Sequence, residues 1–285
     1  MRGRRLWLYK RRRPWLLLRP PVRPAHGILL MLFIRSLLFN IIFYVLTTIW
    51  CLGIIWTLVM PRQVGVAAVR TYMRILAFFE RVVIGLHYEV KGLEHLPKDG
   101  AVLIGAKHQS MWETMKLHLM FHDPAIVLKH ELLYIPIWGW YAAKSKMIPV
   151  KRGKRGAAIK SLVAGAQQMK AMGREIVIFP QGTRVAPGVY APYKVGISML
   201  YEALGVPLVP MALNSGVFWG RHSFIKRPGT ITIEFLPPIP PGLSKETALF
   251  ELEARLEAAS DRLVTAVGGP ATLNPTAAGH AAPSR

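Results

Sequence analysis

The sequence predicts an α/β domain with a mostly parallel sheet flanked by helices, preceded by a two-helix membrane anchor at the N-terminus. After residue 90, short apolar runs rich in Val and Ile alternate with helical stretches, which is typical of a parallel sheet. Before them, residues 36–60 form a stretch of twenty-five residues without a charge, long enough for a membrane-spanning helix. Of the 285 residues, 52% are hydrophobic and 18% are charged, which excludes an ordinary soluble domain and a disordered chain.

The predicted strands are short and rich in branched apolar side chains, as buried strands are. They comprise residues 101–106, 125–130, 147–152, 175–180, 207–213 and 230–235. The predicted helices of the same domain comprise residues 110–121, 154–172, 194–204 and 246–266. We therefore divide the chain into a basic, disordered tail (1–27), a membrane-anchoring helical pair (28–90), a folded domain (91–266) and a second disordered tail (267–285).

The anchor is predicted to contain two helices of different kinds. The first, 36–60, is long enough to cross a hydrocarbon layer of about 30 Å. The second, 64–86, sets Arg70, Arg74 and Arg81 among apolar residues at helical spacing, which indicates an amphipathic helix in the membrane interface. Because basic segments lie on both sides of the first helix, the positive-inside rule favours a hairpin or re-entrant anchor over a single crossing. We expect the C-terminal domain on the cytoplasmic face of the inner, cytoplasmic membrane.

The charge of the chain is strongly positive and unevenly distributed. Lys and Arg number 37 against 15 Asp and Glu, and the first 79 residues contain thirteen basic and no acidic side chains. This charge favours anionic partners, and the apolar composition favours membrane phospholipids over nucleic acid, for which the sequence has no binding motif. Either the basic tail lies on anionic lipid, or translation begins at Met31 and residues 1–30 are not made. The single cysteine, Cys51, excludes a disulfide scaffold and a cysteine zinc site.

The most informative segment is KHQSMWETM, directly after the first predicted strand. His108 and Glu113 are five residues apart, so on one helix they would point about 140° away from each other. They meet only if His108 precedes the helix and Glu113 lies in its first turn. Ser110 then caps the helix, and its spacing to Glu113 matches a capping box, which is the purely structural alternative. The two interpretations are compatible, because one carboxylate oxygen can cap while the carboxylate also contacts the imidazole.

A second candidate segment, FPQGTR, follows another predicted strand. Its residues Gly182, Thr183 and Arg184 offer backbone and guanidinium donors to phosphate oxygens. Lys194 at the start of the next predicted helix and Arg152 at another strand end add positive charge to the same site. For these two residues, ordinary surface charge is the alternative.

The order of these segments resembles the lysophosphatidic acid acyltransferases, also called 1-acylglycerol-3-phosphate acyltransferases. The first motif of that family, N-H-x-x-x-x-D, reads KHQSMWE here, with Lys107 for Asn and Glu113 for Asp. The second, G-x-I-F-I-D-R, reads KMIPVKR, and FPEGTR reads FPQGTR with Gln181 for Glu. The fourth is similar to VPLVPMALNSG, with Pro210 at its fixed position. The resemblance covers about residues 95–260.

This resemblance implies a membrane-bound enzyme that moves an acyl chain from a thioester donor to the free hydroxyl of lysophosphatidic acid, giving phosphatidic acid. His108 would be the general base, Glu113 would orient it, and Arg184 would bind the phosphate. The co-substrate would be acyl-coenzyme A or acyl-carrier protein, with no cofactor and no metal. Two alternatives stay open: transfer to another lyso-lipid, such as a lyso-ornithine lipid or a lysophospholipid with a headgroup, which Gln181 leaves possible, or a non-catalytic lipid-binding membrane protein.

Two rival sites fail on their local sequence. His118 and His122 are four residues apart with Asp123 adjacent, but the Glu of the zinc motif H-E-x-x-H is missing. Ser110 stands close to His108, yet the G-x-S-x-G turn of a serine hydrolase does not surround it. We therefore expect neither a metal site nor a serine nucleophile.

Overall fold

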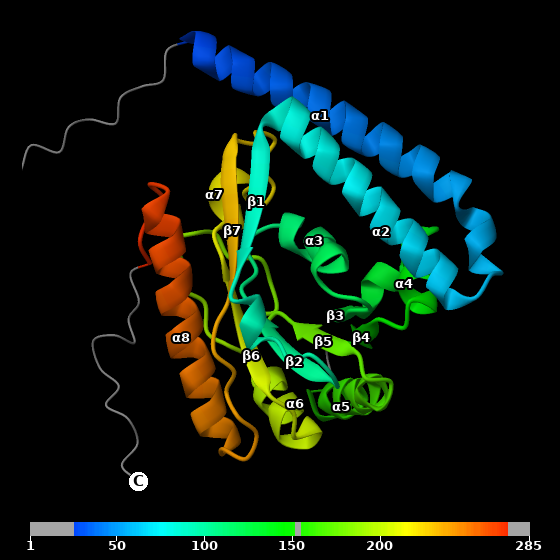
Figure 1. Ribbon diagram of the computed structural model, residues 1–285, viewed down its shortest axis with the longest axis vertical. Helices are drawn as coiled ribbons and strands as arrows, with labels where there is room; N and C mark the ends of the chain where they lie inside the picture. The colour runs from blue at the N-terminus through cyan, green and yellow to red at the C-terminus, as the bar shows by residue number, and fades with distance from the viewer. Residues whose placement is uncertain (1–25, 152–154, 273–285) are drawn as a thin grey trace, which may run out of the picture.

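The computed structural model describes residues 26–151 and 155–272 (Figure 1). Most of the two predicted tails, 1–27 and 267–285, lies outside these residues, as does Arg152. The described chain forms a seven-stranded sheet with helices on both faces. This arrangement confirms the predicted α/β class.

The sheet has the strand order β1-β7-β6-β2-β5-β3-β4. All neighbouring strands are parallel except β6 and β7, which pair antiparallel, so the sheet is mostly parallel as predicted. The strands are β1 (Leu86–Lys91), β2 (Val102–Ala106), β3 (Ala125–Lys129), β4 (Ile148–Val150), β5 (Glu175–Ile178), β6 (Leu208–Leu213) and β7 (Gly229–Phe235). Six of them were predicted from the sequence, and only β1 was missed.

Alternate residues of each strand point to opposite faces of the sheet, and each face carries its own hydrophobic core. Leu103 and Ile176 belong to the core under α5, α6 and α8. Ile104 and Val177 belong to the core shared with α1, α2 and α3. The helices are α1 (His26–Gly53), α2 (Arg62–Phe79), α3 (Trp112–Met120), α4 (Trp138–Lys144), α5 (Arg155–Ala171), α6 (Gly196–Leu204), α7 (Ser215–Phe218) and α8 (Lys245–Ala266).

Short helical turns complete the chain between these elements. A 3-10 turn, η1 (Ile55–Leu58), links α1 to α2, and a π-helical turn, η2 (Glu80–Ile84), links α2 to β1. Two more 3-10 turns, η3 (Leu93–His95) and η4 (His130–Tyr134), precede β2 and α4. The N-terminal helices are thus joined directly to the edge strand of the sheet (Figure 1).

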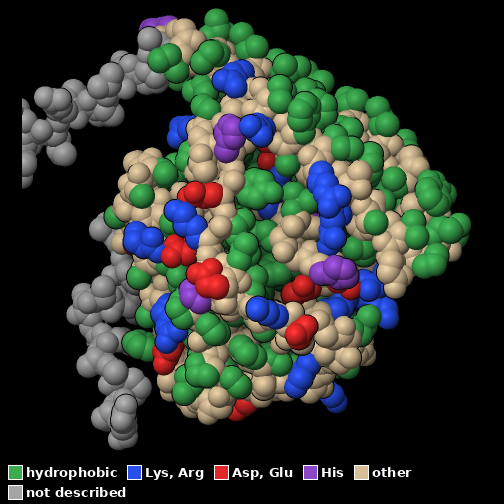
Figure 2. Space-filling view, viewed as in Figure 1, with side chains coloured by type: hydrophobic (Ala, Val, Ile, Leu, Met, Phe, Trp, Pro, Cys, Tyr) green, Lys and Arg blue, Asp and Glu red, His purple; other side chains and the backbone are tan. Residues whose placement is uncertain are grey.

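The N-terminal helix α1 has the properties of a membrane helix. Its 28 residues span about 42 Å at 1.5 Å per residue, more than a hydrocarbon layer of about 30 Å. Most of its large apolar side chains are exposed, and they cover the outer surface of α1 in Figure 2. Within the described residues, α1 is the one helix long and apolar enough to cross a membrane. The protein is therefore expected at a membrane, in agreement with its composition.

The structure has one long apolar N-terminal helix, α1, where the sequence predicted a membrane-anchoring helical pair. Two arginines of α2, Arg62 and Arg70, contact the folded domain, whereas Arg74, one of the three arginines predicted to lie in the membrane interface, is exposed. Arg62 forms an ion pair with Asp123 at 2.7 Å, and the guanidinium of Arg70 donates to the backbone carbonyls of His118 and Phe121. A helix whose charges pair with the domain packs on that domain, and α2 accordingly lies against α3.

The sheet brings three loops to one edge. The strands β5, β2 and β6 are parallel neighbours in the middle of the sheet, so their carboxyl ends lie side by side. Residues 107–111, 179–185 and 214–216 follow these three ends. Ligands of open α/β sheets bind at this kind of edge. The two segments singled out in the sequence both lie there.

Candidate active site

A histidine and a buried carboxylate meet at the carboxyl end of β2. Nδ1 of His108 lies 2.8 Å from Oε1 of Glu113. His108 precedes α3 and Glu113 lies in its first turn, as their spacing predicts. The Glu113 side chain is fully buried, whereas 16% of the His108 side chain is exposed. The pair therefore joins a fixed anion to an imidazole that a ligand can reach.

Glu113 also holds the backbone of the loop that carries the histidine. Its Oε1 accepts hydrogen bonds from the backbone N–H of Gln109 at 2.8 Å and of Ser110 at 2.7 Å. Oγ of Ser110 accepts from the backbone N–H of Trp112 at 3.2 Å. Glu113 makes its half of the predicted capping box, whereas the Ser110 hydroxyl accepts from Trp112 instead of from the backbone N–H of Glu113, and Met111 is the N-cap of α3. Glu113 thus caps α3 and contacts His108 at the same time.

The second oxygen of Glu113 is bound by a residue that the sequence analysis missed. Oγ of Ser215 donates to Oε2 of Glu113 at 2.8 Å, and the backbone N–H of Gly216 donates to Oε1 of Gln109 at 2.9 Å. Ser215 is fully buried at the start of α7. The sequence signal for it was the segment VPLVPMALNSG, which contains Ser215 but was singled out only for Pro210.

The FPQGTR segment packs against the histidine. The ring of Phe179 stacks on the imidazole of His108, with centroids 4.0 Å apart and 20° between the ring planes. The backbone N–H of Val185 donates to the carbonyl of His108 at 2.8 Å. Between these two contacts Gly182 has a φ of +66°, which glycine adopts without a steric penalty. The first and third predicted motifs therefore form one site across β2 and β5.

The predicted phosphate-binding residues lie on the turn after β5 and beyond it. Arg184 is half-buried, and its guanidinium forms no ion pair within the described part of the chain. Its carbonyl accepts a hydrogen bond from Arg221 at 3.0 Å. Thr183 and Lys194 are both exposed. Lys194 stands two residues before α6, and its backbone N–H donates to the carbonyl of Pro180 at 2.9 Å.

The three remaining predicted residues have different outcomes. Gln181 is buried; its Nε2 donates to the carbonyl of Ala191 at 3.4 Å, and its Oε1 has no partner in the described chain. Pro210 lies in β6 opposite Gly105 of β2, so it belongs to the sheet and supports the site from below. Arg152 lies outside the described residues, and β4, which precedes it, is the edge strand of the sheet.

A buried ion pair stands directly before His108. Nζ of Lys107 lies 2.5 and 2.6 Å from the two carboxylate oxygens of Glu257 on α8, and the hydroxyl of Tyr193 donates to the same carboxylate at 2.8 Å. Burial, followed by the charge of Glu257, raises the pKa of Tyr193, which keeps this hydroxyl a donor. The backbone N–H of Lys107 donates to the carbonyl of Met211 at 2.9 Å. The chain entering the site is therefore held by both β6 and α8.

The dyad has the geometry of a histidine general base. A carboxylate that accepts from Nδ1–H fixes the tautomer and leaves the lone pair on Nε2. Within the described chain Nε2 of His108 makes no hydrogen bond, so it is free to take a proton from a bound hydroxyl. Among the described residues, no group of three His, Cys, Asp or Glu side chains is placed to hold a metal ion.

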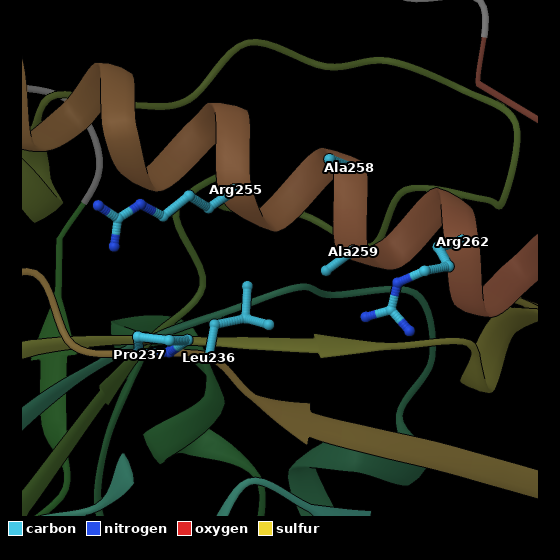
Figure 3. A pocket seen from close by; sticks show the side chains of 6 residues that line it. All are labelled: Leu236, Pro237, Arg255, Ala258, Ala259 and Arg262. Atoms are coloured by element: carbon cyan, nitrogen blue, oxygen red, sulfur yellow. The ribbon is translucent and has the colours of Figure 1, made fainter.

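A cavity of about 480 Å³ lies away from this site, between α8 and the end of β7 (Figure 3). Arg255 and Arg262 project from α8 above Leu236. Both arginines are neutralised, because Arg255 pairs with Glu251 at 2.5 Å and Arg262 with Glu234 at 2.6 Å. Since β7 is antiparallel to β6, its end points away from the carboxyl edge that carries His108. We therefore place no function in this cavity.

A histidine held by a buried carboxylate at the carboxyl edge of a mostly parallel sheet defines an α/β enzyme with an acid–base site. A model of the family described as "Acyltransferase" matches residues 87–214, which include the loops 107–111 and 179–185 and the first residue of the third loop. The chain is also 36% identical, over 190 residues, to the 1-acyl-sn-glycerol-3-phosphate acyltransferase of Pseudomonas aeruginosa, covering 67% of this chain and 74% of that protein. The protein belongs to this acyltransferase family.

Two further relatives extend the comparison. The 1-acyl-sn-glycerol-3-phosphate acyltransferase of Limnanthes alba is 27% identical over 198 residues, which cover 68% of this chain and 70% of that protein. The crystal structure of the 1-acyl-sn-glycerophosphate (LPA) acyltransferase PlsC from Thermotoga maritima superposes with a TM-score of 0.66 at 20% identity. The superposition covers 81% of this chain and 97% of that one, so the two proteins share their fold.

Proposed function

We propose that the protein is a 1-acyl-sn-glycerol-3-phosphate acyltransferase, which esterifies the free hydroxyl of lysophosphatidic acid and forms phosphatidic acid for phospholipid synthesis. The observation that carries this proposal is the His108–Glu113 pair packed against the FPQGTR turn, where a base and phosphate donors stand together. The similarity to 1-acyl-sn-glycerol-3-phosphate acyltransferases over two thirds of the chain supports it.

The proposed reaction is a direct transfer with His108 as general base. Nε2 takes the proton of the lipid hydroxyl while its oxygen forms a bond to the thioester carbonyl carbon. The tetrahedral intermediate then collapses, the carbon–sulfur bond breaks, and the imidazolium returns its proton to the thiolate. Glu113 stabilises the imidazolium, and because four hydrogen bonds fix its carboxylate, little reorganisation is needed during the step.

The lipid phosphate is proposed to bind beside this base. The guanidinium of Arg184 is unpaired within the described chain and follows the Gly182 turn, so it offers a fork of donors to phosphate oxygens. Thr183 and Lys194 are exposed, and we include them as further phosphate donors. We include Arg152 as a further candidate on the basis of its motif.

The remaining assignments concern the setting of the reaction. We propose that the catalytic domain, residues 91–266, lies on the cytoplasmic face of the inner membrane with α1 as its anchor. Its donor is acyl-coenzyme A or acyl-carrier protein, both anionic and therefore attracted to a basic chain. The alternative acceptor is a different lyso-lipid, and Gln181 is the feature that favours it. Gln181 is buried in the turn 179–185, and its Oε1 has no hydrogen-bond partner among the described residues.

An acyl-transfer assay in detergent or nanodiscs tests the proposal. Lysophosphatidic acid and lyso-ornithine lipid are each offered with acyl-coenzyme A and with acyl-carrier protein. We expect phosphatidic acid from the wild type and from His87→Ala, which changes an exposed histidine on the edge strand β1, and none from His108→Ala. Equal activity of His108→Ala would overturn the base assignment. Acylation of lyso-ornithine lipid alone would make this lipid the acceptor in place of lysophosphatidic acid.

A further inference from the structure

A second cavity, of about 400 Å³, lies between the membrane helix and the catalytic domain. We name it the α1 pocket. Its polar lining includes Arg184 and Lys226, and its apolar wall includes Trp219 and Phe224. Asn40 and Tyr44 line the pocket from α1. The pocket therefore lies between the turn 179–185 of the active site and α1, the one described helix that is suited to a membrane.

The α1 pocket opens close to the reacting groups. Arg184 directly precedes Val185, whose backbone N–H donates to the carbonyl of His108 at 2.8 Å. Met111, another lining residue, directly follows Ser110 of the capping box. A molecule whose charged end contacts Arg184 thus has its adjoining atoms close to the His108 loop.

Lys226 is the unusual residue of this pocket, because it is a buried cation without a counter-ion. Only 5% of the residue is exposed. Its Nζ donates to Oδ1 of Asn40 at 2.6 Å and to the carbonyls of Phe224 at 3.1 Å and Ser223 at 3.4 Å, and it lies 5.1 Å from the ring centroid of Trp219. All of these partners are neutral.

Burial without a carboxylate disfavours the charge of this lysine. It lowers the pKa of Lys226 to about 8. No acidic residue lines the α1 pocket, and no ion pair joins Lys226 or Arg184 to a carboxylate in the described chain. Proteins rarely bury charges unless something pairs with them. Two unpaired cations around one cavity point to an anionic ligand.

The membrane helix itself holds this lysine in place. Oγ of Ser36, fully buried in α1, accepts from the backbone N–H of Lys226 at 3.0 Å, and Asn40 lies one helical turn further along. Polar residues within an apolar helix mark the face that meets protein or ligand. The neighbouring Tyr44 is exposed, so the α1 side of the pocket leads from this polar face to the apolar surface of the helix.

A pocket with a cationic end and an aromatic wall beside a membrane helix fits a single-chain amphiphile with a phosphate head. We propose that the α1 pocket receives the phosphate end of the lysophospholipid acceptor from the membrane, and that Lys226, held by Asn40, shares that phosphate with Arg184. Lys226 thereby sets the preference for an acceptor with a phosphate. This inference rests on the proposed acyltransferase function and adds a contribution of the membrane helix to acceptor binding.

Steady-state kinetics of the full chain in nanodiscs test this role. Lys226→Met removes the charge, Lys226→Arg keeps it, and Lys160→Met is the matched control, because Lys160 is exposed on α5. The acceptors are lysophosphatidic acid and monoacylglycerol, which differ in the phosphate. We expect Lys226→Met to raise KM for lysophosphatidic acid about 10- to 100-fold, as for loss of a charge-assisted hydrogen bond. The preference of Lys226→Met for lysophosphatidic acid over monoacylglycerol should fall by the same factor, while Lys160→Met stays within about threefold of wild type. Lys226→Arg keeps the positive charge in a larger group and should retain most of this preference.

Several results would overturn the proposal. One is an unchanged KM for lysophosphatidic acid in a folded Lys226→Met protein, and another is an equal loss with both acceptors. A rise in the KM for acyl-coenzyme A alone would assign the pocket to the phosphates of the donor. Should Lys226→Met not fold, Lys226→Gln keeps a polar end and replaces it in the same comparison.

Equilibrium binding separates this inference from the proposed function. Lysophosphatidic acid is titrated into His108→Ala protein with and without Lys226→Met. The pocket is supported if lysophosphatidic acid binds more tightly to the protein that keeps Lys226 than to the Lys226→Met protein, while monoacylglycerol binds equally to both. This holds even when the wild type transfers no acyl chain to lysophosphatidic acid. Equal binding by the two proteins overturns the pocket even when the wild type is an active acyltransferase.

Discussion

Ser215 donates a hydrogen bond to Oε2 of Glu113 across a separation of 102 residues, at an O···O distance of 2.8 Å. Nδ1 of His108 lies at the same distance from the other oxygen of that carboxylate. The serine therefore fixes the rotation of the group that orients the imidazole. A residue in this position acts through Glu113 and is a positioning residue.

We predict that Ser215→Ala lowers kcat about tenfold with little change in either KM. The carboxylate loses a charge-assisted hydrogen bond, which is worth about 1.5–3 kcal/mol. It then holds the imidazole less firmly, so part of this free energy is lost from the stabilisation of the transition state. Steady-state kinetics with Ser161→Ala as the control check the prediction, because Ser161 is exposed on α5. A wild-type kcat in Ser215→Ala would remove the serine from the positioning network.

The charge of Glu113 is predicted to matter more than its hydrogen bonds. Glu113→Gln keeps the size of the side chain but can no longer stabilise an imidazolium at Nδ1. We expect kcat to fall about 100- to 10,000-fold, the range that general base catalysis contributes. Glu113→Asp should lie between Gln and wild type, since it keeps the charge but is too short to reach both His108 and Ser215.

Steady-state kinetics of Glu113→Asp and Glu113→Gln, compared side by side, distinguish the charge of the carboxylate from its shape. The kcat of Glu113→Asp should exceed that of Glu113→Gln, because only the aspartate keeps a negative charge beside the imidazole. A Glu113→Gln enzyme with the wild-type kcat would show that the carboxylate only caps α3.

The stacked ring of Phe179 is predicted to hold the imidazole from its face. Phe179→Leu removes an aromatic contact worth about 0.5–1.5 kcal/mol, so kcat should fall about two- to tenfold. Phe179→Tyr keeps the stack with His108 and should stay close to wild type. Kinetics of the two variants at saturating donor give the comparison, and equal kcat values for Leu and Tyr would show that the ring is packing alone.

The fold could largely be predicted from the sequence because its signals are local. Buried strands form apolar runs of Val and Ile, and all six such runs are strands in the structure. The edge strand β1, LHYEVK, was missed because most of its side chains are exposed and leave no apolar run. The packing of α2 on the domain could not be predicted because the hydrogen bonds from Arg70 to the carbonyls of His118 and Phe121 are tertiary contacts, and helical periodicity alone does not distinguish lipid from protein on the apolar face.

The site could be predicted only where its residues are near in sequence. His108 and Glu113 are five residues apart, so helix geometry alone requires their meeting. Ser215 and Glu257 come from 102 and 150 residues away from their partners, and a serine or glutamate at such positions has no local signal. Lys226 was one basic residue among 37 until the pocket around it was known.

We predict that His118 makes the protein sensitive to mild acid. Burial, followed by the charge of Arg70, lowers the pKa of His118 to about 4, below its ordinary value of 6.5. The unfolded chain therefore binds a proton near pH 6.5 that the folded chain binds only near pH 4. The stability due to neutral His118 is fully present above pH 6.5 and is lost as the pH falls from 6.5 to 4.

Thermal unfolding of wild type and His118→Gln between pH 7 and pH 4 checks this expectation. A glutamine cannot be protonated, so the Tm of His118→Gln should fall less over this window than that of the wild type. Parallel Tm curves for the two proteins would exclude His118 as the source of the acid sensitivity.

We predict that removing one partner of the buried pair of Lys107 and Glu257 destabilises the protein more than removing both charges together. Lys107→Met leaves the Glu257 carboxylate buried without its cation, which should lower the free energy of unfolding by about 3–5 kcal/mol. In the double variant Lys107→Met/Glu257→Gln no charge is left, and the amide oxygen still accepts from Tyr193. We expect the double variant to recover at least half of the loss, measured by urea or thermal unfolding in detergent. Additive losses would mean that Lys107 and Glu257 stabilise α8 independently, since coupled residues deviate from additivity.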